Sequence, residues 1–270
     1  FMQRVLKETD GWAKFRVCDT IGWGSPDPYA PLPVGIPRLI STLIQETGAE
    51  LEFHGHNDFG MATANNMAAY RYGCKRANVA FAGLGERSGN TSLEQVLVNY
   101  IRIYGDPGFR LNTLGEIRDL LSKEVYPIPV KQPIIGEVFA TQAGLHQSGV
   151  RRQEEAEGGL IYLPFNADMV GDESVELNRI GALSGMDGII AVLNQQVKQE
   201  SGRLGRYTTT SKVVKQVYDA IQDAYNGTPD PRSNTLTGQR RTFFTPEEIL
   251  ALTREAEVKS KQSAPARRSA

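Results

Sequence analysis

The stretch LEFHGHNDFGMATANNMAAYRYG, residues 51–73, decides the fold of this 270-residue chain. It begins as a short strand-like run and continues into a helical segment over residues 61–72, which Gly73 ends. The same order of strand, glycine-containing turn and helix occurs before it, at residues 14–44, and after it, at residues 77–100. Three consecutive βα units predict a parallel sheet covered by helices.

Glycines mark the ends of elements in the two flanking units. In the first unit, the strand over residues 14–19 ends in TIGWG, and apolar residues at helical spacing over residues 36–44 predict a helix that Gly48 ends. In the third unit, the strand over residues 77–82 ends in GLG. TSLE, residues 91–94, has the pattern of a capping box, in which a hydroxyl and a glutamate bond each other's backbone amides. We therefore expect a helix to begin there.

The pattern changes after residue 105. Apolar residues recur at helical spacing over residues 112–125 and 214–225, and TPEE, residues 245–248, predicts the start of a last helix. The stretch between the first two of these helices has mixed character. We expect an α/β region over residues 1–105, a mostly helical α+β region over residues 106–230, and a loop, terminal helix and flexible tail over residues 231–270.

Composition excludes several classes of protein. The chain has 30 Lys and Arg residues against 31 Asp and Glu residues, a formal net charge of -1, which argues against nucleic acid as a partner. It has no run of about 18 apolar residues, so we expect no membrane-spanning segment. Two cysteines are too few for a disulfide framework, and no signal-peptide pattern is present, so we expect a cytoplasmic protein.

The strongest local signal is the pair His54 and His56, which uses two of the three histidines in the sequence. Because strand side chains alternate between faces, both imidazoles point to the same side, from positions roughly 7 Å apart along the strand. Two imidazoles placed in this way can bind one divalent cation. The alternative is two polar residues on a solvated edge strand. The position at the end of a strand, where βα folds place their sites, favours the cation.

Two further patches contribute candidate residues. GLGERSGN, residues 83–90, follows the next strand, and neighbouring parallel strands lie about 5 Å apart, so its polar residues can face the same site. There, Asn90 offers a carbonyl oxygen as a ligand. The third histidine, His146, lies in GLHQSG, outside the βα units. An isolated histidine of this kind is more often structural, and a catalytic role requires the second region to fold over the βα units.

Five blocks, in this order, resemble the 2-isopropylmalate synthase and homocitrate synthase family, a branch of the DRE-TIM metal-dependent enzymes. The blocks are CDTIG (18–22), HGHNDFGMATAN (54–65), GLGERSGNTSLE (83–94), AGLHQSG (143–149) and IYLPFNADMVG (161–171). Related lyases that act on 3-hydroxy-3-methylglutaryl-CoA have a cysteine in the loop where this chain has Glu86 and Arg87, so a cysteine-dependent lyase is disfavoured. CDTIGWG and the prolines after it are also similar to the Re-face citrate synthases.

The resemblance implies an α/β fold: the C-terminal portion, about three βα units, of a TIM (β/α)8 barrel, followed by the mostly helical α+β region. A complete barrel has eight strands and about 250 residues. The family carries an Asp-Arg-Glu motif on its N-terminal strand, and this motif does not occur in the sequence. We therefore expect the first five units to be absent from it. Residues 1–105 would be a partial catalytic barrel, and residues 106–230 would cover its active site.

The resemblance also implies a reaction: Claisen-type condensation of acetyl-CoA with a metal-bound 2-oxo acid, followed by hydrolysis of the thioester. His54 and His56 match the family's metal ligands, and Asn90 matches a residue at or beside the metal. The ion would be Zn²⁺, Mn²⁺ or Mg²⁺, and acetyl-CoA would be the co-substrate. Thr20 matches a hydroxyl that binds the carboxylate of the oxo acid.

His146 and Tyr162 match a histidine and a tyrosine of the family that lie near the proton transfer from the acetyl-CoA methyl group. The family's C-terminal region often reaches across a dimer, so the resemblance implies a homodimer. The oxo acid stays open between 2-oxoisovalerate, 2-oxoglutarate, pyruvate and oxaloacetate, and Re-citrate synthesis is the alternative within the class. A hypothesis from another class is a catalytically silent fragment or partner subunit that lacks the Asp-Arg-Glu strand.

Overall fold

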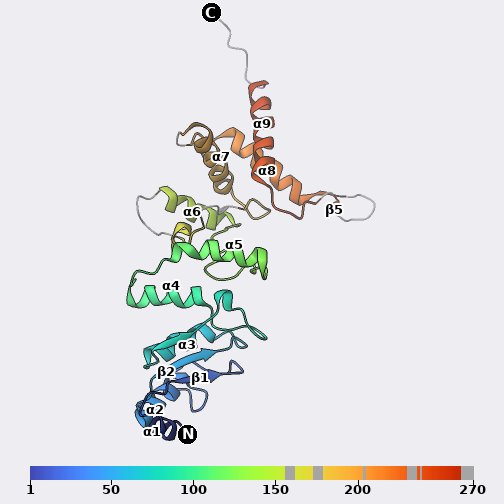
Figure 1. Cartoon of the computed structure of the whole chain (residues 1–270). Helices are drawn as coiled ribbons and strands as arrows, with labels where there is room; N and C mark the ends of the chain where they lie inside the picture. The colour runs from blue at the N-terminus through green and yellow to red at the C-terminus, as the bar shows by residue number, and fades with distance from the viewer. Residues whose placement is uncertain (156–161, 173–178, 203–204, 230–235, 238, 263–270) are drawn as a thin grey trace, which may run out of the picture. The chain divides into compact units, whose positions relative to one another are not determined.

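The computed structural model of the chain describes residues 1–155, 162–172, 179–202, 205–229, 236–237 and 239–262. The chain forms two compact units, Phe1–Val138 and Phe139–Ala270 (Figure 1). Each unit has its own buried hydrophobic cluster. Among the described helices, none has the length and apolar character needed to cross a membrane.

A three-stranded parallel sheet organises the first unit. Its strands lie in the spatial order β1 (Phe15–Asp19), β2 (Leu51–Gly55) and β3 (Arg76–Asn78). Each strand is followed by a helix, so the predicted series of three βα units and the α/β class are confirmed. The helices are α2 (Ile36–Thr47), α3 (Ala62–Arg71) and α4 (Leu93–Tyr104).

Alternation along β2 separates a buried face of the sheet from a polar one. Leu51 and Phe53 are almost completely buried, whereas Glu52 and His54 are half-buried. Leu51 and Phe53 pack in a cluster with side chains of α2 and α3, and removal of their apolar surface from water stabilises this face. His54 therefore lies on the face that these two helices do not cover.

The third βα unit differs from the sequence prediction. The strand expected over residues 77–82 ends at Asn78, and Phe81–Gly83 form a short 3-10 turn, η1. Ala82, within this turn, has a φ of 54°, which places it in the left-handed region. A strand cannot continue through such a residue, because its backbone must be extended.

The capping box predicted at residues 91–94 is wrong, although the helix begins where expected. The N-cap is Ser92, whose hydroxyl accepts a hydrogen bond from the Gln95 N–H at 3.4 Å. Thr91 is completely buried, and its hydroxyl donates to the carbonyl of Gly55 at 3.2 Å. Glu94 bonds outside the helix instead of to the cap. Both residues of the predicted box therefore form tertiary hydrogen bonds instead of capping the helix.

Helices complete the first unit. The helix predicted over residues 112–125 is confirmed as a 3-10 turn, η2 (Leu111–Thr113), followed by α5 (Leu114–Glu124). A further helix, α1 (Met2–Glu8), precedes the sheet.

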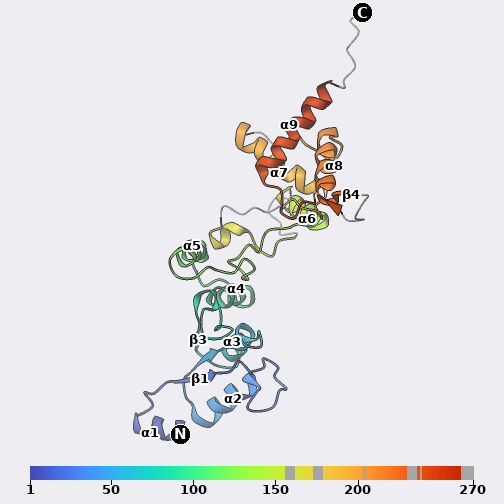
Figure 2. The same ribbon diagram turned by 90° about the vertical axis from the view of Figure 1, so that its right-hand side faces the viewer.

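The second unit is mostly helical, as predicted. Helices α7, α8 and α9 pack against one another, and α6 packs against α7 (Figure 1 and Figure 2). Its elements are α6 (Gly144–Glu155), the 3-10 turn η3 (Ala167–Val170), α7 (Met186–Ser201), α8 (Lys212–Asn226), the short strands β4 (Thr228–Pro229) and β5 (Leu236–Thr237), and α9 (Pro246–Gln262). The strand β5, which pairs antiparallel with β4, lies in the segment over residues 231–270 whose beginning was expected to be a loop.

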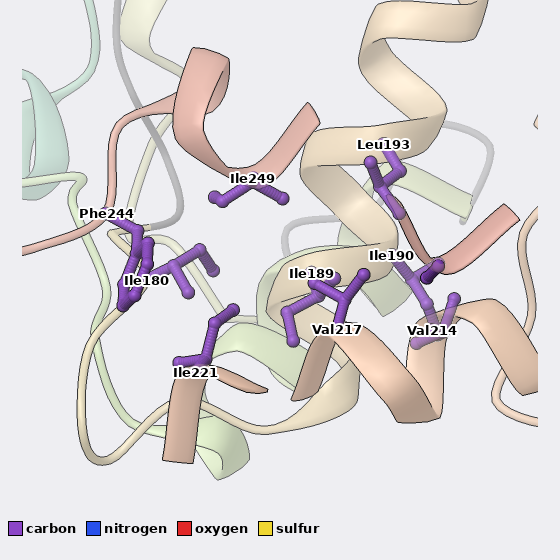
Figure 3. Packing of buried hydrophobic residues seen from close by; sticks show 10 residues of the cluster. Ile180, Ile189, Ile190, Leu193, Val214, Val217, Ile221, Phe244 and Ile249 are labelled. Atoms are coloured by element: carbon purple, nitrogen blue, oxygen red, sulfur yellow. The ribbon is translucent and has the colours of Figure 1, made fainter. Parts of the chain in front are cut away.

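The core of the second unit is built from apolar stripes on three helices (Figure 3). Val214, Val217 and Ile221 of α8 face Ile189 and other residues of α7, and all are nearly inaccessible to water. The helical spacing over residues 214–225 therefore predicted this face correctly. The remaining buried members are Ile180, Ile190, Leu193, Phe244, Ile249 and Ala256.

The start of α9 has the capping box that the sequence predicted. The backbone N–H of Thr245 donates to Glu248 Oε2 at 2.8 Å, and the N–H of Glu248 donates to Thr245 Oγ1 at 3.3 Å. Two amides at the helix end are thereby satisfied by local side chains.

Candidate functional site

His54 and His56 are brought together at the carboxyl end of β2. Their Nε2 atoms lie 3.3 Å apart, and the ring planes are inclined at 85°. The prediction that both side chains share one face is confirmed. Two nitrogens that bind one zinc ion tetrahedrally, at about 2.1 Å each, lie about 3.4 Å apart. The observed separation therefore suits two ligands of a single cation.

Asn78 fixes the orientation of the His54 ring. It lies beside His54 in the register of the sheet, and its Oδ1 is 2.8 Å from His54 Nδ1. An amide oxygen accepts only, so His54 Nδ1 donates, and the lone pair of the neutral ring is on Nε2. The role of Asn78 was not predicted from the sequence, although a polar residue within the otherwise apolar run of residues 77–82 was a usable signal.

Asn90 lies next to His56 along the backbone and has an unsatisfied side-chain oxygen. Its backbone forms an isolated antiparallel bridge with His56, and its Nδ2 donates to the carbonyl of Leu84 at 3.1 Å. Asn90 Oδ1 is buried and has no hydrogen-bond partner within the described part of the chain. The same holds for His56 Nδ1. A buried carbonyl oxygen without a partner is costly, by about 1–3 kcal/mol, unless an ion or a water molecule satisfies it.

Glycines allow the loop over residues 83–90 to close on Asn90. A Cβ atom on Gly85 would lie 2.3 Å from Asn90 Nδ2. Gly89 has a φ of 87°, and a Cβ there would lie 2.2 Å from the carbonyl oxygen of Gly83. Either side chain would displace Asn90, so the glycine-rich pattern has a steric cause at these two positions.

Arg87 links the segments that follow the three strands through hydrogen bonds. Its Nε and Nη2 atoms donate to the two carboxylate oxygens of Asp58 at 2.8 and 3.0 Å, and Nη2 also donates to the carbonyl of Thr20. This bidentate bond holds the pKa of Asp58 below its usual value, because it stabilises the ionised carboxylate. Arg87 belongs to the motif GLGERSGN, but the motif alone did not indicate this role.

The Thr20 side chain is exposed at the end of β1 and lines a cavity of about 440 Å³. Cys18 and Asp19 line the same cavity, with apolar side chains of α2 and of the segment before it. Neither histidine of the pair nor Asn90 is among its lining residues. Thr20 therefore connects the strand ends to this apolar space.

Within the described ranges, no group of three or more His, Cys, Asp and Glu side chains could hold a metal ion. The candidate set is instead two imidazoles and the amide oxygen of Asn90. A neutral set of two nitrogens and one oxygen fits a divalent ion of borderline or hard character. The unpartnered Asn90 Oδ1 is the observation that favours this fit.

The second unit brings together His146 and Tyr162. The hydroxyl of Tyr162 is hydrogen-bonded to His146 Nδ1, and the ring centroids lie 5.5 Å apart. His146 is in the first turn of α6, and both side chains are exposed. A Cβ atom on Gly149 would lie 2.8 Å from the Tyr162 ring, so this glycine lets the tyrosine pack on the helix.

Comparison with known proteins identifies relatives among the synthases. Residues 2–121 match the model of the HMGL-like family. The chain is 33% identical over 229 residues to a citrate (Re)-synthase of Syntrophus aciditrophicus, which covers 82% of the chain and 36% of that protein. It is 32% identical over 225 residues to homocitrate synthase 1 of Nostoc, covering 77% and 56%. For the 2-isopropylmalate synthase of Sulfolobus acidocaldarius, identity is 32% over 190 residues, covering 69% and 46%.

The chain thus spans between about a third and just over half of the length of these relatives. The matched family segment contains the whole parallel sheet, both histidines of the pair and the loop that ends at Asn90. Residues 2–121 therefore form an HMGL-like domain, and the chain is a relative of the citrate (Re)-, homocitrate and 2-isopropylmalate synthases that its motifs resemble.

Proposed function

We propose that the enzyme containing this chain condenses acetyl-CoA with a 2-oxo acid in a Claisen-type reaction and then hydrolyses the thioester. The observation that carries the proposal is the 3.3 Å separation of the His54 and His56 Nε2 atoms. Asn90, whose backbone forms a bridge with His56, adds a buried Oδ1 without a partner in the described part of the chain. Support also comes from the relatives, which are named as synthases of citrate, homocitrate and 2-isopropylmalate.

His54, His56 and Asn90 would hold a divalent cation, Zn²⁺, Mn²⁺ or Mg²⁺. When bound, this ion would act as a Lewis acid that polarises the keto group of the oxo acid. Asn78 keeps the proton of His54 on Nδ1, which leaves Nε2 as a ligand. In this proposal, Thr20 binds the carboxylate of the oxo acid through its hydroxyl.

His146 and Tyr162 would supply the acid–base pair for the methyl group of acetyl-CoA. If His146 Nδ1 donates its proton to the Tyr162 hydroxyl oxygen, the second ring nitrogen, Nε2, has a lone pair that can accept a proton. The hydrogen bond between the two side chains supports a joint role in this proton transfer. We propose a homodimer, in which the second unit of one subunit serves the first unit of the other.

One substrate has specific support. Two citrate (Re)-synthases, from Syntrophus aciditrophicus and Clostridium kluyveri, are 33% and 34% identical to the chain, against 30–32% for the other synthases compared. Oxaloacetate is therefore the first 2-oxo acid to test. 2-Oxoisovalerate, 2-oxoglutarate and pyruvate complete the panel.

The test is release of free CoA from acetyl-CoA by the full-length protein with each 2-oxo acid, with and without a chelator. We expect release with one acid, inhibition by the chelator and restoration by Mn²⁺ or Zn²⁺. His54→Ala and His56→Ala should abolish release, because each removes a ligand. Absence of metal-dependent release with every acid would contradict the proposal and favour a catalytically silent subunit.

A further inference from the structure

Glu94 is a buried carboxyl group whose bonds lead to the candidate ligand Asn90. Its side chain, in the first turn of α4, is completely inaccessible to water. Glu94 Oε2 accepts the backbone N–H of Ala82 at 3.0 Å, and Oε1 accepts Gln132 Nε2 at 3.2 Å. Burial of a carboxyl group costs free energy unless hydrogen bonds compensate for the lost hydration. These two bonds provide that compensation, and they link the side chain to Ala82 and Gln132.

Ala82 is held at both of its backbone polar groups. Its N–H is bonded to Glu94, and its carbonyl oxygen accepts Gln132 Nε2 at 3.1 Å. The left-handed conformation of Ala82 is unfavourable for a residue with a Cβ atom and persists only where the surroundings impose it. Glu94 and Gln132 are the side chains that impose it here.

The turn at Ala82 leads directly into the contacts that orient Asn90. The carbonyl of Gly83 accepts the backbone N–H of Asn90 at 2.8 Å, and the carbonyl of Leu84 accepts Asn90 Nδ2 at 3.1 Å. With Nδ2 engaged in this way, Oδ1 is the amide atom left without a partner. A shift of the Ala82 turn would move both carbonyls and release the amide of Asn90.

We propose that Glu94 and Gln132 are positioning residues that fix the side-chain amide of Asn90 and thereby set the affinity of the site for a divalent cation. The inference rests on the proposed cation site and extends it to a residue outside the motifs, since Gln132 follows α5 in the chain. Neither residue touches the ion or the substrate in this proposal. Both act through the backbone of residues 82–84.

The experiment measures Mn²⁺ affinity by electron paramagnetic resonance of the free ion, without substrate, in the full-length protein. We expect Glu94→Gln and Gln132→Ala to weaken binding by roughly 10- to 100-fold, as is typical when a partner of a metal ligand is removed. Glu94→Gln keeps an oxygen that can accept the Ala82 N–H, but it replaces the acceptor of Gln132 Nε2 by a second NH2 group. Gln95→Ala is the matched control, because its side chain bonds Thr63 and not the turn.

A double-mutant cycle separates positioning from a general loss of stability. If Glu94 and Gln132 act through Asn90, combining either change with Asn90→Ala should weaken Mn²⁺ binding no further than Asn90→Ala alone. Additive losses, or losses no larger than that of Gln95→Ala, would overturn the inference while leaving the proposed function intact. An unmodified protein that binds no Mn²⁺, Zn²⁺ or Mg²⁺ would overturn both. Gln132 is only half-buried, so Gln132→Ala can still be used to test the inference if Glu94→Gln does not fold.

Discussion

The two regions that contain histidines are built on different principles. His54 and His56 are half-buried at the end of a strand, and His54 is held on one side by Asn78 and on the other by His56. His146 is exposed in the first turn of a helix, and its partner Tyr162 comes from a separate segment. The first arrangement keeps two nitrogens at a fixed spacing, which suits an ion. The second joins two groups that can both release and accept a proton, which suits proton transfer.

The sharpest test of this contrast is Asn78→Ala, which removes the contact that makes His54 rigid. We expect Mn²⁺ affinity to fall by roughly 10- to 100-fold, because the ring is then free to rotate and to change tautomer. Titration of the protein with Mn²⁺ measures the loss. Asn78→Asp keeps an oxygen acceptor and should restore binding. Equal losses in both variants would show that the acceptor oxygen at position 78 is not what orients His54.

A smaller effect is expected for Arg87→Ala, which removes the hydrogen bonds to Asp58 and to the carbonyl of Thr20. The pair with Asp58 is partly exposed to solvent, so we expect the loss of Mn²⁺ affinity to stay below about tenfold. The matched control is Arg4→Ala, which breaks an exposed pair with Glu8 in α1. A loss as large as that of Asn78→Ala would mean that the loop, and not the strand, is the main determinant of the site.

The same variant has a pH signature. Because the folded pKa of Asp58 is depressed, its contribution to stability is complete above the unfolded pKa and is lost as the pH falls through the folded value. Arg87→Ala should therefore raise the pKa of Asp58 toward its usual value and remove this contribution to the acid dependence of stability. Nuclear magnetic resonance titration of the Asp58 carboxyl carbon measures the shift.

The smallest effect on the cation is expected for His146→Gln and Tyr162→Phe. Mn²⁺ affinity should change by no more than about twofold, whereas CoA release should fall by roughly 100- to 10,000-fold, the usual contribution of an acid–base group. Tyr162→Phe keeps the ring that packs on Gly149, so it separates the hydroxyl from the packing. A clear loss of Mn²⁺ binding in either variant would show that the assigned division between the two histidine regions is wrong.

Much of the fold was predictable because it depends on local patterns. The βα units, the apolar stripe of α8 and the end of α2 at Gly48 follow from periodicity and from the left-handed conformation of that glycine. The third strand was only partly predictable. Residues 77–82 are apolar enough for a strand, but the bonds that Glu94 and Gln132 make to Ala82 impose a turn instead.

The two TxxE sequences show where local patterns stop being sufficient. At Thr245 and Glu248, both side chains bond the helix end, as the pattern predicts. At Thr91 and Glu94, the same pattern lies in the interior, and both side chains bond residues far away in the sequence. In the interior, distant backbone groups also need partners, and they compete with the cap for the same side chains.

The amino-acid sequence alone determined that His54 and His56 share a face, because the period of a strand is two residues whatever surrounds it. It also determined the glycines that the Asn90 loop requires. Only the tertiary structure decided that Asn78 orients His54 and that Arg87 links the ends of three strands. It also decided that Glu94 accepts the N–H of Ala82 instead of capping its own helix. These partners are set by strand register and packing, and residue spacing along the chain does not encode which distant groups will meet.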